Sequence, residues 1–239
     1  PDQGANEITG GNTTDTFFFF YVMACYVFYT LENLPGLSFM NSGQTCFAQT
    51  RVIATPGVYD KVVAGFRAWA EAQVLGDPLV ETTTFGPLVH AAAVTRSHKY
   101  TTDAVAGGAR LIAGGPDAPV PAAGNFVAPT VIADADNSSS LCQNEIFGPV
   151  VSIIRAKDED DAIRLANDVD YGLAGTVWTA NSETALRVAR QVEAGSFGVN
   201  GYIPDMGAPW GGVKSSGTGR EQGPQAIDDF TRIDTVYVF

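Results

Sequence analysis

Apolar positions beyond residue 50 follow two alternating spacings. Short runs rich in β-branched residues are typical of strands, and they fall at residues 51–55, 110–113, 125–133, 149–156, 174–179 and 196–200. Between them, apolar residues that recur every three or four positions predict helices at residues 58–75, 91–106, 158–169 and 182–192. This alternation predicts an α/β fold, in which a largely parallel twisted sheet carries flanking helices.

Three segments depart from this alternation. The run Val150–Ile154 has almost no polar alternation, which predicts a strand covered on both faces. Residues 201–223 are rich in glycine and predict a long irregular loop. The last segment, Arg232–Phe239, alternates again and predicts a terminal strand.

A second apolar run, Phe17–Tyr29, lies near the amino end and contains no charged residue. A helix needs about 20 apolar residues to cross a bilayer, so this run is too short to span one. No positively charged segment precedes it, so we do not expect a signal peptide. We expect a buried element of a larger fold, and docking to a membrane or a partner protein is the alternative.

Composition narrows the possible functions. The formal net charge is -12, which argues against a nucleic-acid partner because phosphate backbones need basic surfaces. The two histidines and three cysteines lie too far apart in sequence for zinc-ligand spacing, so we expect no metal site. So few cysteines, odd in number, do not form a disulfide framework, and we expect a cytoplasmic protein.

Two glycine-rich stretches do not fit phosphate-binding motifs. Residues 207–215 separate Gly212 from Lys214, whereas a P-loop needs glycine and lysine adjacent. Residues 217–223 have the wrong glycine spacing for a dinucleotide fingerprint. No Gly-x-Ser-x-Gly elbow occurs, which disfavours a serine hydrolase.

One segment does fit a catalytic pattern. Residues Phe39–Arg51 read FMNSGQTCFAQTR and place Cys46 between a glycine-bearing turn and a predicted strand. The segment resembles the cysteine signature of the aldehyde dehydrogenase superfamily, F-x-N-x-G-Q-x-C-x-A-x-x-R, at every specified position. Other stretches resemble landmarks of that family's catalytic domain in the same order. They are Gly86-Pro-Leu88, Ala128-Pro-Thr130, Glu145–Val150, Tyr171–Ala174, Gly195 with Asn200, Pro209–Gly212 and Ser216–Glu221.

The resemblance implies a division of the chain. Residues 39–223 would form the catalytic domain, and residues 224–239 a segment whose strand joins a partner subunit in a homo-oligomer. Residues 1–38 would be a divergent amino-terminal segment.

The resemblance also implies the chemistry. Cys46 matches the nucleophile, whose thiolate attacks an aldehyde; hydride leaves to NAD or NADP, and water opens the resulting thioester. Glu145 and Phe147 match the pair that contacts the nicotinamide ribose and ring. Phe47 and Met206 are expected to line the aldehyde tunnel.

The resemblance fails at two places. The family's general base is a glutamate in an E-L-G-G-K-type motif, and the nearest likeness here, Glu7-Ile-Thr-Gly-Gly11, has an extra threonine and no lysine. The family's dinucleotide-binding domain precedes the region that these residues match. We therefore expect negligible dehydrogenase turnover from this chain by itself.

Two alternatives to aldehyde oxidation stay open. The chain could be a catalytically incompetent homologue that acts as an assembly or regulatory subunit. It could also transfer the acyl group to coenzyme A instead of water.

Overall fold

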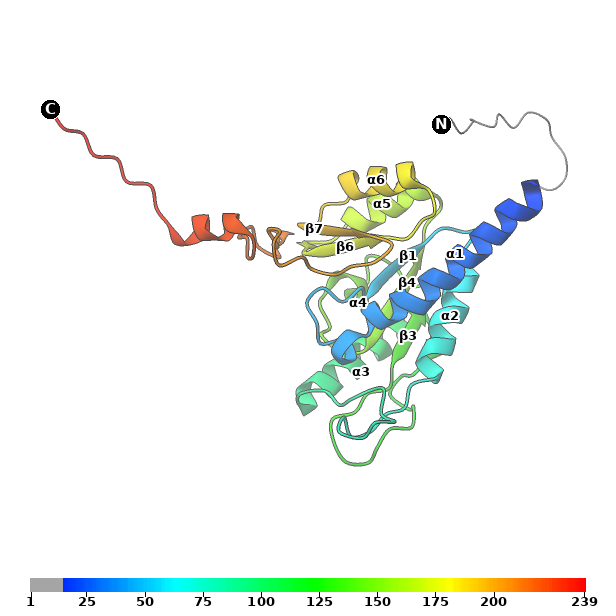
Figure 1. Cartoon of the computed structure of the whole chain (residues 1–239). Coiled ribbons are helices and arrows are strands. Elements are labelled where there is room, and N and C mark those ends of the chain that lie inside the picture. The colour runs from blue at the N-terminus through cyan, green and yellow to red at the C-terminus, as the bar shows by residue number, and fades with distance from the viewer. Residues whose placement is uncertain (1–14) are drawn as a thin grey trace.

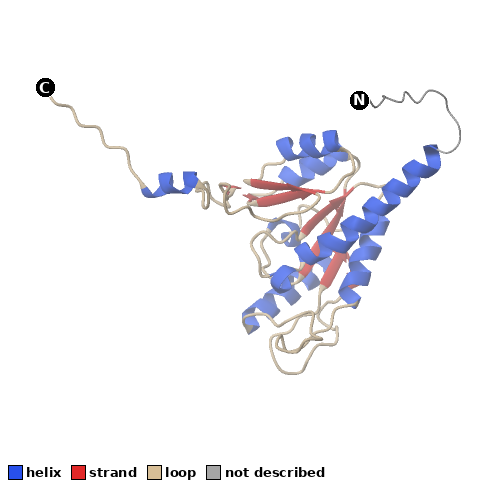
Figure 2. Cartoon of the chain, in the orientation of Figure 1, coloured by secondary structure: helices blue, strands red, loops and turns tan. Residues whose placement is uncertain are grey.

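The computed structural model describes residues 15–239, and side chains from residue 27 onward. Glu7 therefore lies outside the described residues. Figure 1 shows a central sheet flanked by helices, a second small sheet beside it, and a carboxyl-terminal segment that extends away from both. Figure 2 shows the same arrangement coloured by secondary structure.

The central sheet has four strands in the order β1-β4-β3-β2. Its members are β1 (Arg51–Ala54), β2 (Arg110–Ala113), β3 (Thr130–Ala133) and β4 (Val150–Arg155). β1 and β3 each pair with β4 in parallel, whereas β2 pairs with β3 in the antiparallel direction. The predicted α/β fold with a largely parallel sheet is confirmed.

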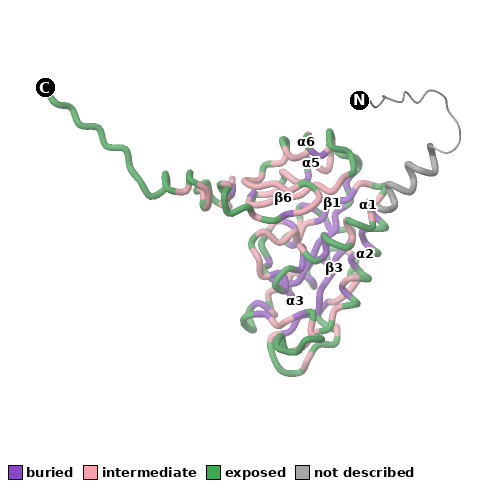
Figure 3. The backbone as a smooth tube through the Cα atoms, viewed as in Figure 1, coloured by how far each residue is buried: buried purple, intermediate pink, exposed green. Residues whose placement is uncertain are grey.

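Helices cover both faces of this sheet. On one face lie α1 (Asp15–Ser38) and α2 (Tyr59–Glu71), and on the other α3 (Ala91–Ala106), α4 (Ser140–Gln143) and α5 (Glu159–Asn167). Because side chains alternate along a strand, β4 contributes to both cores. Val151 and Ile153 pack with α2, and Val150 and Ile154 pack with α3 and α4. The predicted coverage of this strand on both faces is confirmed, and Figure 3 shows the buried strands.

A second sheet pairs β6 (Ala174–Val177) in parallel with β7 (Ser196–Val199). The helix between them, α6 (Ser182–Gln191), begins at Asn181, whose side chain accepts hydrogen bonds from two backbone amides of the first turn. A short antiparallel pair, β5 (Tyr171–Gly172) with β8 (Val213–Lys214), joins the glycine-rich loop to this unit. The loop that follows β7 therefore returns onto the sheet.

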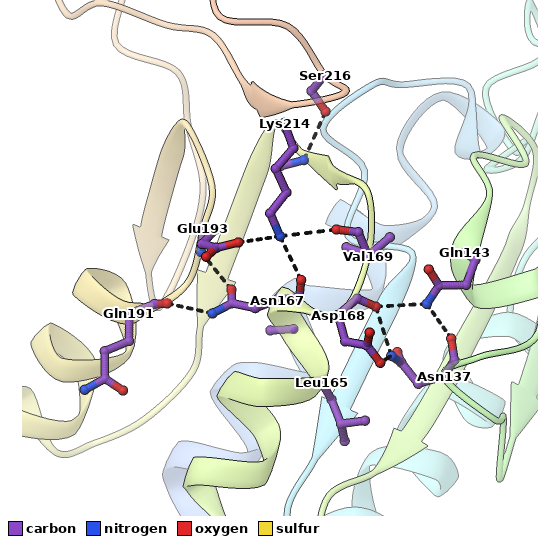
Figure 4. A network of polar contacts seen from close by, with 12 residues as sticks. Asn137, Gln143, Leu165, Asn167, Asp168, Val169, Gln191, Glu193, Lys214 and Ser216 are labelled. Atoms are coloured by element: carbon purple, nitrogen blue, oxygen red, sulfur yellow. Dashed lines mark hydrogen bonds and ion pairs between the residues drawn. The ribbon is translucent and has the colours of Figure 1, made fainter.

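Lys214 lies at the centre of a polar network at the carboxyl end of α5 (Figure 4). Its ammonium donates to the carbonyls of Asn167 at 2.7 Å and Val169 at 3.2 Å, and pairs with the carboxylate of Glu193 at 2.5 Å. Gln143 donates to the carbonyl of Asp168. The last carbonyls of a helix have no partner within it. The contacts of Lys214 therefore fix the end of α5 against the returning loop, and that of Gln143 ties it to α4.

Several predicted boundaries need correction. α2 ends at Glu71 rather than at residue 75, because the chain turns there and Leu75 forms a β-bridge with Phe85. The strand expected at 125–133 begins only at Thr130, since Pro129 cannot donate a ladder hydrogen bond.

The segment Arg232–Phe239, expected to be a strand, forms no strand with the described part of this chain. After η2 (Pro224–Phe230), a 3-10 helix, the last residues are exposed and pair with no strand of the described chain. A β-strand needs a neighbour to satisfy its backbone groups, and within residues 15–239 no strand lies beside this segment.

The apolar run Phe17–Tyr29 belongs to α1, and most of its side chains lie outside the described residues. The expectation that the run is buried is wrong at Phe28 and Tyr29, which are 67% and 47% exposed. A helix that is apolar on all sides can bury only the stripe that faces its neighbour, here α2, where Leu31 packs against Gly65. Among the described helices, none is both long and apolar enough to cross a membrane.

Candidate active site

The loop that precedes Cys46 has an unusual backbone. Asn41, Ser42 and Gly43 have φ angles of 51°, 56° and 73°, so three consecutive residues lie in the left-handed region. Residues other than glycine rarely adopt this region, and such strain is held only where surrounding contacts require it. The tight coil ends at Gln44, two residues before Cys46.

Hydrogen bonds from a distant segment hold this coil. The hydroxyl of Ser42 donates to the carbonyl of Gly86 at 3.0 Å, and the amide of Val89 donates to Oε1 of Gln44 at 2.9 Å. Nδ2 of Asn41 and Nε2 of Gln44 each donate to the other's backbone carbonyl. Two stretches that resemble family landmarks, around Cys46 and at 86–88, are thus in direct contact.

Gly43 lies directly against the segment that carries Glu145 and Phe147. A Cβ at Gly43 would be 2.1 Å from the carbonyl oxygen of Gly148, closer than any side chain can approach. Only glycine therefore allows the two loops to meet.

Cys46 occupies a turn between this coil and β1. The amide of Ala48 donates to the carbonyl of Thr45 at 3.0 Å, so Cys46 and Phe47 are the central residues of a β-turn. The Cys46 thiol is free and exposed, whereas Cys142 is buried. Burial raises the pKa of the Cys142 thiol, which disfavours its thiolate. Of these two cysteines, only Cys46 can meet a substrate in solution.

Glu145 and Phe147 are both exposed, on the loop between α4 and β4. Phe147 has a φ of 53°. Arg96 of α3 holds this loop, since its guanidinium donates to the carbonyls of Ile146 at 2.5 Å and Phe147 at 3.3 Å. The carboxylate of Glu145 and the ring of Phe147 are thus free to contact a ligand. The loop that carries them meets the coil that precedes Cys46.

An aromatic cluster surrounds the ring of Phe47. Tyr202 and Trp210 lie with ring centroids 5.4 and 6.5 Å from it. The hydroxyl of Tyr202 accepts a hydrogen bond from Nε1 of Trp210 at 2.7 Å and shares another with the hydroxyl of Ser196 at 2.6 Å. Met206 belongs to the same loop but is 74% exposed, and its proposed contact with substrate stays a prediction.

Tyr202 and Trp210 were not predicted as site residues. Trp210 belongs to the Pro209–Gly212 stretch that resembles a family landmark, which is a signal in the sequence. No local pattern indicates that Trp210 contacts Phe47, because the two residues lie 163 positions apart in the sequence.

The last residue of the cysteine motif, Arg51, has a structural role. Its guanidinium donates to the carbonyls of Leu165 at 2.6 Å and Ala166 at 3.1 Å, near the carboxyl end of α5. Burial lowers the pKa of this guanidinium, although an arginine stays charged near neutral pH. It anchors the start of β1 and therefore the turn before it.

No group of three or more histidine, cysteine, aspartate or glutamate side chains placed to hold a metal ion occurs in the described part of the chain.

Comparisons with known proteins identify the family. Residues 29–236 match the family model for the aldehyde dehydrogenase family, a match that begins before residue 39, where the resemblance was expected to start. Geranial dehydrogenase from Castellaniella defragrans is 46% identical over 208 residues, which cover 87% of this chain and 43% of that protein. An aldehyde dehydrogenase from Emericella nidulans is 40% identical over 83% of this chain and 40% of its own length.

Solved structures agree with the sequence matches. The aldehyde dehydrogenase of Mycobacterium tuberculosis, complexed with NAD+, superposes with a TM-score of 0.82 at 38% identity, over 89% of this chain and 45% of that one. Betaine aldehyde dehydrogenase from Staphylococcus aureus, also in complex with NAD+, gives 0.81 at 33% identity, over 85% and 41%. This chain thus spans less than half the length of the relatives it matches. The cysteine motif, the fold and these matches together show that the chain belongs to the aldehyde dehydrogenase family.

Proposed function

We propose that this chain supplies the catalytic half of an enzyme that oxidises an aldehyde to a carboxylic acid with NAD or NADP. The observation that supports this most is the exposed Cys46, which lies in the turn just after a strained coil that packs against the loop of Glu145 and Phe147. The nucleophile and the residues proposed to contact the coenzyme thereby come from adjacent loops.

In the proposed reaction, the Cys46 thiolate attacks the aldehyde carbon and forms a carbon–sulfur bond. The carbonyl π electrons move to oxygen, giving a thiohemiacetal oxyanion. The backbone N–H of Cys46 would donate a hydrogen bond to that oxyanion, which stabilises charge where it develops. Because the thiolate is the reactive form, an exposed cysteine is suited to this role and the buried Cys142 is not.

The residues of the adjacent loop fit the nicotinamide end of the coenzyme. An exposed carboxylate such as that of Glu145 can accept hydrogen bonds from ribose hydroxyls, and the exposed ring of Phe147 can pack against a nicotinamide. When bound, NAD or NADP accepts the hydride whose loss turns the thiohemiacetal into a thioester. Water then opens the thioester, and Glu7, outside the described residues, is the proposed base.

We propose an aldehyde with an apolar substituent as the substrate. Phe47 follows Cys46 in the chain, and its ring forms an aromatic cluster with those of Tyr202 and Trp210. Aromatic side chains favour contact with apolar groups. The name of the Castellaniella relative, geranial dehydrogenase, points to a substrate of the same character.

We also propose that the chain assembles as a homo-oligomer through residues 232–239. Ile233, Val236, Tyr237, Val238 and Phe239 are all strongly exposed, and an extended apolar segment of this kind can add a strand to a sheet of another subunit.

A chimera tests the proposed oxidation. Residues 29–239 would follow the part of Castellaniella geranial dehydrogenase that precedes its matched stretch, and NADH formation from geranial would be followed by absorbance. Because this chimera leaves out residue 7, it tests the role of Cys46 and not that of Glu7. We expect turnover that Cys46→Ser lowers at least about a thousandfold, whereas Cys142→Ser retains it. The chain by itself should give negligible NADH.

Three other results would change the account. A folded chimera that binds NAD and forms no NADH would contradict the proposal. Equal activity in the Cys46→Ser chimera would exclude this residue as nucleophile. A thioester product that forms only in the presence of coenzyme A would replace hydrolysis by acyl transfer.

A further inference from the structure

We propose that Gln49 and Thr176 are positioning residues that hold the turn carrying Cys46, here named the nucleophile turn (Thr45–Ala48). This inference rests on the proposed function of Cys46. Gln49 falls at an unspecified position of the cysteine motif, and Thr176 lies in β6, so the motif itself assigns neither a role.

The nucleophile turn needs support from outside. Its closing bond is the 3.0 Å hydrogen bond from the Ala48 amide to the Thr45 carbonyl. The Cys46 side chain is exposed, so packing does not set its direction. The direction of the backbone at Cys46 therefore depends on how the residues on either side of it are held. On the amino side the Thr45 hydroxyl donates to the carbonyl of Met40 at 3.3 Å, and on the carboxyl side the neighbour is Phe47.

A one-way chain of hydrogen bonds reaches the backbone of Phe47. Nε1 of Trp178 donates to the Thr176 hydroxyl at 3.1 Å, and that hydroxyl donates to Oε1 of Gln49 at 3.2 Å. Nε2 of Gln49 then donates to the carbonyl of Phe47 at 2.9 Å. Each group donates in the same direction along the chain, so each bond polarises the next.

The side chain of Phe47 is held separately. Tyr202 and Trp210 contact its ring, and the Tyr202 hydroxyl is bonded to both Trp210 and Ser196. Ser196 begins β7, the strand that pairs with β6. The carbonyl and the ring of Phe47 are thus both attached to the small sheet, which can fix the backbone on the carboxyl side of Cys46.

Each member of the chain uses a specific atom. The Gln49 side chain needs both its carbonyl oxygen and its amide nitrogen to join Thr176 to Phe47. A hydroxyl is needed at residue 176, because it must accept from Trp178 and donate to Gln49. Serine can replace threonine there, and valine, which has the same shape without the hydroxyl, cannot.

The experiment compares Thr176→Val, Thr176→Ser and Gln49→Met in the full chain, with Thr95→Val as control. Thr95 donates to a carbonyl within its own helix, α3, and is exposed. Two readouts are measured: hydrogen exchange of the Ala48 amide by NMR, and acetylation by p-nitrophenyl acetate mapped to Cys46. In that reaction the Cys46 thiolate forms a bond to the acetyl carbon, and p-nitrophenolate leaves.

We expect Thr176→Val and Gln49→Met each to speed Ala48 exchange, and to slow Cys46 acetylation by about tenfold, because small displacements of a reacting group lower its rate strongly. Thr176→Ser should restore both readouts, and Thr95→Val should change neither. If Thr176→Val acted only through a loss of packing, Thr176→Ser, which itself removes a methyl group, would not restore the two readouts.

The inference is overturned if Thr176→Val and Gln49→Met leave Ala48 exchange unchanged, or if Thr176→Ser behaves like Thr176→Val. If Thr176→Val does not fold, Gln49→Met decides the same question from the other end of the chain. Absence of acetylation at Cys46 in the natural sequence would instead contradict the proposed function, and Ala48 exchange would still decide the positioning role.

Discussion

At the scale of single residues, burial separates two of the three cysteines, which composition alone treats alike. Cys46 is exposed on a turn, whereas Cys142 lies in the core between α4 and β4, where burial raises its thiol pKa. Reactivity toward electrophiles follows the thiolate fraction and access to solvent.

We therefore predict that iodoacetamide near neutral pH alkylates Cys46 in preference to both Cys25 and Cys142, and at least about tenfold faster than Cys142. Quantitative peptide mapping over time measures these rates in one sample, and Cys142→Ser provides the control. Equal slow labelling of the three thiols would favour the reading of the chain as an assembly or regulatory subunit.

The hydroxyl of Tyr59 makes two hydrogen bonds to Asp134 inside the fold. Tyr59 is fully buried, and its hydroxyl donates to Oδ1 of Asp134 at 2.7 Å and accepts from the Asp134 amide at 2.7 Å. This bond, with further help from Arg110, lowers the pKa of the Asp134 carboxyl. The guanidinium of Arg155 lies 3.6 Å from the centre of the Tyr59 ring.

We predict that Tyr59→Phe lowers the free energy of unfolding by about 1–2 kcal/mol at pH 7, since phenylalanine keeps the ring but not the hydroxyl. A carboxyl whose pKa is lower in the folded chain than in the unfolded chain stabilises the fold at pH values above its unfolded-state pKa. That stabilisation is lost as the pH falls through the folded-state pKa. The difference between the two proteins should thus shrink below about pH 4. Denaturant unfolding at several pH values measures it, and a difference independent of pH would contradict the assigned bond.

At the scale of elements, the central feature is the contact between the coil of residues 40–43 and the loop before β4. Gly43 has a φ of 73°, which favours glycine, and it lies so close to the Gly148 carbonyl that a Cβ would not fit. Two separate features therefore require glycine at this position.

We predict that Gly43→Ala lowers the free energy of unfolding by more than about 2 kcal/mol and slows acetylation of Cys46. Gly57→Ala is the matched control, because a Cβ there meets nothing within 4 Å and its φ is not positive. Unfolding of both variants in denaturant tests this. Equal stability of the two variants would show that the loops do not meet as described.

Local sequence signals predicted elements well where caps and breakers mark their ends. The helix at Ala91–Ala106 has its predicted bounds, because Gly107 and Gly108 follow it and His90 caps its start. The helix at Tyr59–Glu71 was predicted too long, since an apolar residue at position 75 keeps the helical spacing but belongs to a bridge with Phe85.

Contacts between distant segments account for what the sequence did not predict in the site. The motif identified Cys46, and the resemblance named Glu145 and Phe147. The contact of Gln49 with Thr176 spans 127 positions, and no local periodicity encodes such a pair. The roles of Trp210 and Tyr202 likewise follow from packing against Phe47.

At the scale of the whole molecule, the alternation of strands and helices predicted the fold class correctly. The terminal segment pairs with no strand of the described chain, because an alternating pattern states which residues suit a strand and not which sheet they join. The segment at 231–239 is exposed along its length and projects from the body (Figure 1).

We predict that deletion of residues 231–239 changes the free energy of unfolding of a single chain by less than about 0.5 kcal/mol, because it removes no packing within the chain. The same deletion should lower the molar mass of any oligomer, measured by light scattering after size-exclusion chromatography. An oligomer that survives the deletion would contradict assembly through this segment.

The central claim is that Cys46 is the nucleophile, and an activated ester tests it without a hydride acceptor. We predict that p-nitrophenyl acetate releases p-nitrophenolate in an initial burst close to one equivalent per chain, with the acetyl group mapped to Cys46 by mass spectrometry. Cys46→Ser should abolish the burst, and Cys142→Ser should retain it. A burst that survives Cys46→Ser, or an acetyl group found equally on Cys142, would contradict the account.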